Sequence, residues 1–567
     1  MKSSSAKSAS TPHGGGIRGA DQACRSPRYE GRFGRMFRTL EPAVHARDAL
    51  LALGAAMTAV AEGSTDTPPR PIAAPETPEH LQDDEENAGI PAGYTYLGQF
   101  IDHDITFDPM SLLMQKNDPE SIIDFRTPRL DLDSLYGRGP AEQPYMYLGN
   151  KFRLGKRLFA LREPTPSRDV PRYHDLDSPG TAARALIGDK RNDENVIISQ
   201  LGAVFLQLHN RFVDELDGGA ASFDTVQRMV RWHYQFIVIN DFLVRICGKH
   251  MVDAILPNRL VPAPVSQKRP HLDYFHWDHD PAMPIEFSVA AFRFGHSMVR
   301  PIYRLNQQLH GGDDPEHATD DEKRRGLEGR FFIFAGVNKR ALNGFGEFPD
   351  EWAIDWRLFF DIDGSGTLGG KARAQPAYKI DTSLVNPLGF LPEFSVIKPF
   401  HPPLTLDQLH PKPVDALNDP ANLAARNLLR GSAMQLPSGQ AVARTMGLPV
   451  IADADLRVCK ATLADWEAGV ALTEIDARFR NNAPLWFYVL AEAQYEWSRR
   501  AMAPGGLGDA EPVRLGPLGG RIVAETLIGL VYADPFSYLA QDPNWTPTVG
   551  GMGLDMGQLV KYALTGC

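Results

Sequence analysis

Hydrophobic periodicity is the feature of this sequence that most limits its fold. Between positions 195 and 216, apolar side chains recur every three or four residues. They are Ile197, Leu201, Val204, Leu208 and Phe212. This spacing places them on one face of an α-helix, which must be buried. Similar patterns cover 223–247, a segment from Pro284 past Tyr303, and 485–499, whereas alternating strand patterns are short and rare. The sequence therefore predicts a mainly α fold with few short strands.

The chain is long enough to form one large domain. It has 567 residues, 43% of them hydrophobic, so it can bury a sizeable core. Residues 1–85 are interpreted as an N-terminal tail and extension, partly disordered, because small polar residues open it and prolines and acids fill its end. No repeat of fixed period occurs in the sequence, so residues 86–567 are predicted to form a single catalytic domain.

Charge and composition exclude several classes of protein. The net charge of -11 gives no footprint for nucleic acid. No apolar run reaches the roughly 18 residues that a transmembrane helix needs. The first residues lack the apolar core of a secretory signal, so we expect a cytoplasmic protein or export by a signal-independent route.

The cysteines are too few and too scattered for a disulfide framework or a thiolate metal site. They are Cys24, Cys247, Cys459 and Cys567. We expect all of them to be unpaired thiols.

The densest chemistry lies in the segment Leu97–Phe107. On a helix, Gln99, Asp102 and His103 would share one face, because they are three and four residues apart. Asp104 would point about a quarter-turn away. A lone helical histidine is usually a structural residue, so the segment needs its context to be interpreted.

Two further segments supply that context. Residues 188–195 precede the long predicted helix; acids there complement the helix dipole, which leaves Arg191 unexplained. In residues 291–297, His296 follows Gly295, and a glycine inside a helix costs roughly 1 kcal/mol relative to alanine. Either a close helix crossing or a flat group packed against the backbone would account for this glycine.

Together these segments resemble the peroxidase–cyclooxygenase superfamily, whose animal members include myeloperoxidase and lactoperoxidase. The resemblance rests on GQFIDHDITF (98–107), TPRLDLDSLYG (127–137), DKRNDEN (189–195), LHNR (208–211) and AFRFGH (291–296). Weaker similarity at 426–431 and 519–529 extends it over residues 89–547. The chain is identified as a bacterial-type member, and the resemblance implies a single large helical haem peroxidase domain.

The resemblance also implies a role for each residue around a haem. His103 would be the base above the iron, Arg191 the fixed positive charge beside the peroxide, and Gln99 the residue that orders water there. His296 would be the iron ligand on the other face, with Asn427 as the hydrogen-bond acceptor for its far nitrogen.

Further positions of the resemblance concern how haem b is attached. Arg293 and Arg430 match positions near the haem propionates. Asp102 and Glu194 match the two carboxylates that become ester-linked to haem methyl groups. Asn195 stands where a methionine would make a third link, so that link is not expected.

The TPRLDLDS segment has the donors of a calcium site. The side-chain oxygens of Thr127, Asp131 and Asp133 and the backbone carbonyl of Arg129 can wrap a hard cation. Asp104 would complete the shell from beside His103. The alternative is a turn built from aspartates.

The expected activity is peroxidase chemistry. Hydrogen peroxide would be reduced through a ferryl intermediate, with phenols, other aromatic donors, halides or pseudohalides as the small reducing substrate. The alternative is a haem fatty-acid dioxygenase or oxidative tailoring enzyme of the same superfamily. Those dioxygenases carry a tyrosine three residues before the iron-ligating histidine, and here Arg293 occupies that position. The sequence indicates neither the natural electron donor nor the oligomeric state.

Overall fold

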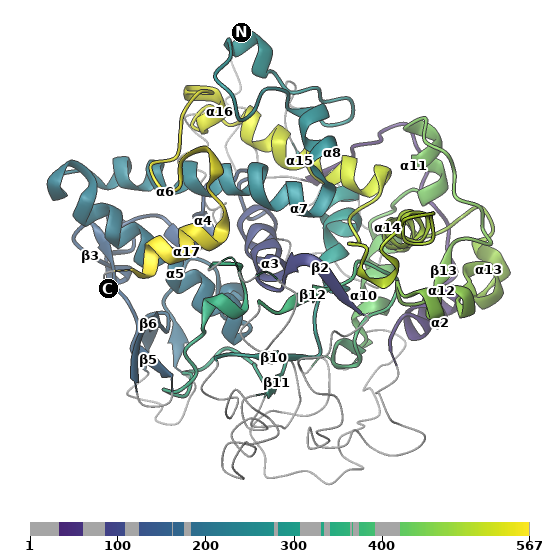
Figure 1. The fold of residues 1–567 in the computed structure, drawn as a ribbon, viewed down its shortest axis with the longest axis horizontal. Coiled ribbons are helices and arrows are strands. Elements are labelled where there is room, and N and C mark those ends of the chain that lie inside the picture. The colour runs from purple at the N-terminus through teal and green to yellow at the C-terminus, as the bar shows by residue number, and fades with distance from the viewer. Residues whose placement is uncertain are drawn as a thin grey trace, which may run out of the picture.

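The computed structural model (Figure 1) describes residues 33–59, 85–107, 124–160, 163–174, 183–276, 282–306, 330–333, 341–362, 364, 366, 374–389, 391 and 420–565. Helices dominate these residues, as predicted, and the strands form small two-stranded pairs. The α-helices are α2 (Arg47–Ala56), α3 (Gly93–Ile105), α4 (Asp133–Tyr136), α5 (Val196–Glu215), α6 (Phe223–Ile237), α7 (Leu243–Cys247), α8 (Lys249–Ile255), α10 (Leu423–Ala433), α11 (Gly439–Thr445), α12 (Leu463–Ala468), α13 (Leu472–Ile475), α14 (Leu485–Ala501), α15 (Pro517–Ala533), α16 (Tyr538–Gln541) and α17 (Met556–Leu564).

The strands are mostly two to four residues long. They are β1 (Phe33–Gly34), β2 (Glu86–Pro91), β3 (Tyr147–Leu148), β4 (Lys151–Phe152), β5 (Arg157–Ala160), β6 (Glu163–Arg168), β7 (Arg172–Tyr173), β8 (Arg184–Ala185), β9 (Met283–Pro284), β10 (Ile302–Arg304), β11 (Arg330–Phe332), β12 (Pro376–Tyr378), β13 (Arg457–Val458) and β14 (Val470–Ala471). All pairs are antiparallel except β1 with β9.

Three of the four predicted helices are confirmed. The predicted helix at 195–216 is α5, and the side chain of Asn195 caps it by accepting hydrogen bonds from the amides of Ile197 and Ile198. The segment 223–247 forms α6 and α7, joined by the π-helical turn Val238–Phe242. The segment 485–499 lies within α14.

The fourth prediction, one regular helix from 284 past 303, is wrong. A π-helical turn (Glu286–Ala290) leads into a 3-10 turn (Ala291–His296), and Ala290 between them has φ -127° and ψ -76°, outside the helical region. The helical conformation ends near His296, because Pro301 has no amide to donate and also disfavours a helical Arg300. The chain continues instead as β10, which pairs with β11.

Helix α3 lies at the centre of the fold and carries the LGQFIDHDI motif (Figure 1). Its start is fixed by β2, which pairs with β12, and by the amide of Gly93, which donates to the carbonyl of Phe359 at 2.8 Å. A Cβ on Gly93 would lie 2.5 Å from that oxygen, so only glycine fits there. Helix α3 packs against α5 and against the turn Ala291–His296.

The segment 33–58, which the sequence interpretation assigns to the N-terminal extension, packs into the same core. Phe33 and Leu53 are among its buried residues. Helix α2 lies so close to α10 that a Cβ on Gly54 would be 2.7 Å from the backbone of Ala425. The remainder of residues 1–85 lies largely outside the described residues, and the domain boundary at residue 86 stays a prediction.

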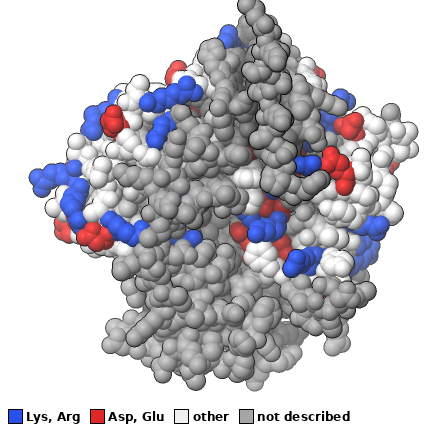
Figure 2. Space-filling view, turned by 180° about the vertical axis from the view of Figure 1, so that it is seen from behind, with Lys and Arg blue, Asp and Glu red and all other residues white. Residues whose placement is uncertain are grey.

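Acidic and basic side chains lie interspersed over the described part of one face (Figure 2). Among the described residues, no helix is both long and apolar enough to span a bilayer. Cys247 and Cys459 are free thiols, whereas Cys24 and Cys567 lie outside the described residues.

Candidate functional site

Helix α3 and the turn Ala291–His296 enclose a cavity of about 320 Å³. Most residues that the sequence assigns to a haem site line it, although they come from three separate segments. They are Gln99, Asp102, His103, Arg191, Glu194, Arg293 and His296. The fold thus brings together residues that lie up to about two hundred positions apart in the sequence.

His103 lies on the α3 side of this cavity and is only 5% exposed. Its Nδ1 lies 2.8 Å from Oδ1 of Asn192, which can only accept a hydrogen bond, so Nδ1 carries the proton. The other nitrogen, Nε2, lies 3.8 Å from Oε1 of Glu194, another residue of the cavity wall. Burial, together with the positive charge of Arg191, lowers the pKa of His103 to about 4. The imidazole is therefore neutral at pH 7, with the lone pair on Nε2.

Asn192 contacts a residue of the candidate site, and the sequence interpretation did not single it out. It lies in the DKRNDEN motif, between Arg191 and Glu194, so the motif itself was the available signal. The contact with His103 joins residues 89 positions apart, and no local pattern indicates it.

Arg191 lines the cavity, but part of its guanidinium is hydrogen-bonded to neighbouring protein groups. Nη2 donates to Asp189 at 2.9 Å and to the backbone carbonyls of His103 at 3.0 Å and Thr106 at 2.7 Å. The guanidinium also lies over the ring of Phe107, 4.7 Å from its centroid. Among the described residues Nη1 has no hydrogen-bond partner, so it is the nitrogen available to a ligand.

Gln99 and Asp102 share the cavity-facing side of α3 with His103, as predicted. The amide of Gln99 donates to Glu194 and accepts from Asn195 at 3.3 Å. The carboxylate of Asp102 accepts from the hydroxyl of Thr106 at 3.0 Å. Asp102 and Glu194 therefore stand on the same wall, one from α3 and one from the turn that precedes α5.

His296 lines the same cavity from the turn Ala291–His296. Its Nδ1 is 2.7 Å from Nδ2 of Asn427, which is on α10. The two residues are therefore in contact, as predicted, but in this amide orientation Asn427 presents a donor to the ring instead of the predicted acceptor. Burial and the charge of Arg293 lower the pKa of His296 to about 3, which keeps its ring neutral. The two predicted histidines thus face one cavity, each with Nδ1 held by an asparagine.

Two features beside His296 fit a flat, acidic group. The Nε of Arg293 is buried and has no hydrogen-bond partner among the described residues, and its side chain lines the cavity. A Cβ built on Gly295 meets nothing within 4 Å, so open space adjoins this part of the backbone. Arg430, three residues after Asn427 on α10, does not line the cavity.

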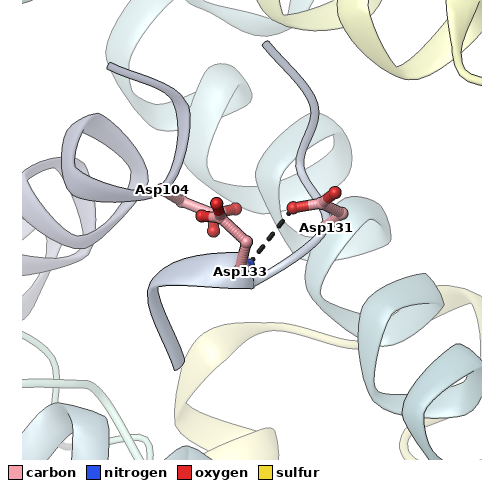
Figure 3. Close-up of side chains that lie close together, drawn as sticks. All are labelled: Asp104, Asp131 and Asp133. Atoms are coloured by element: carbon pink, nitrogen blue, oxygen red, sulfur yellow. Dashed lines mark hydrogen bonds between the residues drawn. The ribbon is translucent and has the colours of Figure 1, made fainter. Parts of the chain in front are cut away.

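The predicted cation donors also converge. Carboxylate oxygens of Asp104, Asp131 and Asp133 lie within 4.8 Å of one another, and all three residues are buried (Figure 3). The hydroxyl of Thr127 donates to Asp131 at 3.1 Å, and the amide of Arg129 donates to the carbonyl of Thr127. The amide of Leu132, a residue in the left-handed conformation, donates to Asp104 at 3.1 Å.

Crowding of these carboxylates is energetically unfavourable without a cation. Burial, then repulsion from Asp131 and Asp133, raises the pKa of Asp104 well above its usual range. An all-oxygen, acidic, buried donor set is the kind that binds a hard cation such as calcium.

Arg126 connects the acidic cluster to the cavity, and the sequence interpretation missed it. This arginine is 1% exposed and donates to Asp133 at 3.1 Å and to Asp189. Asp189 in turn holds Arg191, and these two arginines keep the pKa of Asp189 below its usual range despite its burial. A continuous chain of ion pairs therefore runs from Asp133 to Arg191.

Replacing Arg126 by methionine removes the central charge of this chain. Asp133 and Asp189 would stay buried without their partner, so we expect the free energy of unfolding to fall by about 3–5 kcal/mol. Arg478→Met is the matched control, because Arg478 is 52% exposed and pairs with Asp48 and Asp476 at the surface. That control should lose little stability, because solvent screens exposed ion pairs. Urea unfolding measures both, and equal losses would contradict the role of Arg126.

Comparison with known proteins shows which proteins part of this chain is similar to. Residues 113–325 match the family model for animal haem peroxidases, a stretch that includes Arg191, Glu194 and His296. A peroxidase-like protein of Margaritifera margaritifera is 27% identical, and the match covers 37% of this chain and 32% of that protein. Thyroid peroxidase of Sus scrofa is also 27% identical, over 31% of this chain and 19% of its own length. The chain thus spans about a third or less of these relatives.

Among solved structures, peroxidase A from Dictyostelium discoideum has a similar fold. The alignment covers 93% of this chain and 89% of that one, with a TM-score of 0.51 and 14% sequence identity. The similarity in fold therefore extends well beyond residues 113–325.

Proposed function

Because this chain carries a domain of the animal haem peroxidase family, we propose that it reduces hydrogen peroxide at a haem bound between His103 and His296. The observation that carries the proposal is that two neutral histidines line one cavity from separate segments, each with Nδ1 in contact with an asparagine. The haem would supply the iron that binds peroxide and stores the two oxidising equivalents.

His296 would hold the iron through Nε2. An asparagine amide has nearly the same shape when turned over. With Oδ1 facing His296, Asn427 would accept a hydrogen bond from the Nδ1–H group, which leaves the lone pair of Nε2 free for the iron. Arg293 would pair with a haem propionate, which gives its buried Nε a partner. We place Arg430 at the second propionate, although it stands outside the cavity lining.

His103 would act as the proton carrier. Its Nε2 would take a proton from one oxygen of hydrogen peroxide and return it to the other, which would leave as water. Asn192 keeps the ring oriented for both transfers. The charge of Arg191, presented through Nη1, would stabilise the negative charge that develops as the O–O bond breaks, and Gln99 would hold a water beside His103.

The reducing substrate would be a phenol, another aromatic donor, a halide or a pseudohalide. The alternative, a fatty-acid dioxygenase or oxidative tailoring enzyme, would draw on a tyrosine at position 293, and Arg293 cannot supply a phenoxyl radical. The residue at this position therefore favours the peroxidase.

Replacing His103 by alanine tests the proposal. We expect the rate of reaction with peroxide to fall by about 10²–10⁴-fold, because the proton carrier is lost while His296 still binds the haem. Stopped-flow absorbance of the haem measures this rate. The exposed His271→Ala is the control and should react like the wild type. A His103→Ala protein as fast as the wild type would refute the assignment.

We further propose that Asp102 and Glu194 form ester links to the haem. Both carboxylates line the cavity near His103, where the edge of a haem would lie. After exposure to peroxide, acidified organic solvent should then leave the haem on the wild-type chain. The double variant Asp102→Asn, Glu194→Gln should release it, whereas Glu142→Gln, at the surface, should retain it. Release from the wild type would exclude the esters.

We propose calcium as the cation of the Asp104, Asp131 and Asp133 cluster, with Thr127 and the carbonyl of Arg129 as further ligands. Calcium at about 100 times its Kd should stabilise the chelator-treated protein by roughly 3 kcal/mol. Asp131→Asn should abolish this stabilisation, and Asp350→Asn, a surface carboxylate paired with Lys156, should not. Thermal unfolding with and without calcium measures it; a wild type indifferent to calcium would contradict the site.

A further inference from the structure

A second cavity, of about 410 Å³, lies away from the proposed haem site. Strand β6, helix α17 and the segment 353–357 line it, and it shares no lining residue with the first cavity. Trp356 forms part of its wall and is 3% exposed. The Nε1 of this indole is buried and has no hydrogen-bond partner among the described residues.

The second cavity has the character of a site for an anionic aromatic molecule. Its walls are largely apolar, with Ile354, Val560 and Leu564 among them. Lys561 and Arg357 also line it, whereas Asp355 is the one carboxylate among the described lining residues and already pairs with Arg357 at 2.8 Å. The remaining positive charge favours a ligand with a carboxylate or sulfonate group.

Aromatic rings connect the two cavities. Tyr94, on α3, lines the haem cavity, and its ring centroid lies 5.4 Å from that of Phe360. Phe360 is stacked on Trp356, at 6.0 Å and an interplanar angle of 26°. A single buried phenylalanine therefore separates an oxidisable tyrosine at the first cavity from an oxidisable tryptophan at the second.

A parallel series of rings also ends at Trp356. Tyr96 lines the haem cavity and lies 5.5 Å from Tyr303, which is 6.1 Å from Phe359, and Phe359 is 5.8 Å from Trp356. All of these rings are buried. Contact between π-systems gives the electronic overlap that electron transfer through a protein needs.

Tyr94 has a proton acceptor in place. Its hydroxyl donates to Oδ2 of Asp241 at 2.6 Å, and Asp241 is held by Arg245 at 2.7 Å and by the amide of Met556 at 2.9 Å. A tyrosine that loses an electron becomes strongly acidic, so a carboxylate at this distance lets it release the proton and take it back. Asp241 thus accepts the hydrogen bond of Tyr94 in addition to those from Arg245 and Met556.

We propose that Trp356 is a second oxidation site, which takes electrons from an anionic aromatic donor in the second cavity and passes them through Phe360 and Tyr94 to the haem cavity. The proposal rests on the proposed peroxidase function, which supplies the oxidant. It assigns to this chain a binding site for donors too large to share the first cavity with a haem.

The electrons and protons of this relay balance. Tyr94 gives one electron to the oxidised haem and its hydroxyl proton to Asp241. Trp356 then reduces Tyr94, which regains the proton from Asp241, and the donor reduces Trp356; a phenolic donor loses its own proton to water. Two such transfers, together with two protons taken up from water, reduce one hydrogen peroxide to two waters and leave two oxidised donor radicals.

The test compares a small and a bulky donor on the haem-loaded, full-length protein. Iodide reacts at the haem itself, whereas the sulfonated dye ABTS is bulky and anionic. For Trp356→Phe we expect iodide oxidation like that of the wild type and a fall in kcat/KM for ABTS of about tenfold or more. Trp466→Phe, a half-buried tryptophan in neither cavity wall, is the control and should keep both activities.

A second readout does not depend on turnover. When the wild type meets peroxide without a donor, a spin trap should add to Trp356, which peptide mass spectrometry locates. A wild type that oxidises neither donor overturns the proposed function and the relay with it. If iodide is oxidised but Trp356→Phe handles ABTS like the wild type, or Trp356 is not trapped, the relay alone is overturned.

Discussion

The ion pairs of Arg126 are the constraint on which one wall of the cavity depends. This buried guanidinium joins Asp133, in the acidic cluster, to Asp189, which holds Arg191. Removing one partner from a buried pair leaves an uncompensated charge, so breaking any pair of this network costs stability. It fixes the TPRLDLDS loop, the start of α5 and the end of α3 relative to one another. Ion pairs and hydrogen bonds, as well as apolar packing, therefore fix the positions of His103 and Arg191.

The opposite wall is built by irregular backbone. In a regular α-helix through Glu286–His296, the side chains would follow one periodicity around the helix axis. The π-helical and 3-10 turns have different numbers of residues per turn, so they change which side chains face the cavity. Glu286 anchors this segment, because its buried carboxylate accepts the amides of Met36 and Phe37. His296 then faces the cavity while Asn427 of α10 lies behind it. The residues before β2 thus take part in positioning the candidate iron ligand.

Local patterns in the sequence predicted the features that depend on interactions between residues close together in the chain. The 3.6-residue periodicity located α5 and α14, and the spacing of Gln99, Asp102 and His103 placed them on one face of α3. The irregular turn before His296 was missed, because apolar residues in a buried segment fit several helical geometries. Arg126 and Asn192 were missed for another reason: their importance lies in contacts with residues 63 and 89 positions away. The motifs showed which segments matter, and only the fold shows which of their side chains meet.

The central claim is that a haem lies between His103 and His296 with its iron bound to His296. The most direct measurement is the absorption spectrum of the protein purified from haem-supplied cells, beside that of His296→Ala. The account predicts a Soret band in the wild type and its loss or marked shift in the variant, with His271→Ala unchanged. A wild type without a Soret band, or a His296→Ala protein with the wild-type spectrum, would contradict it.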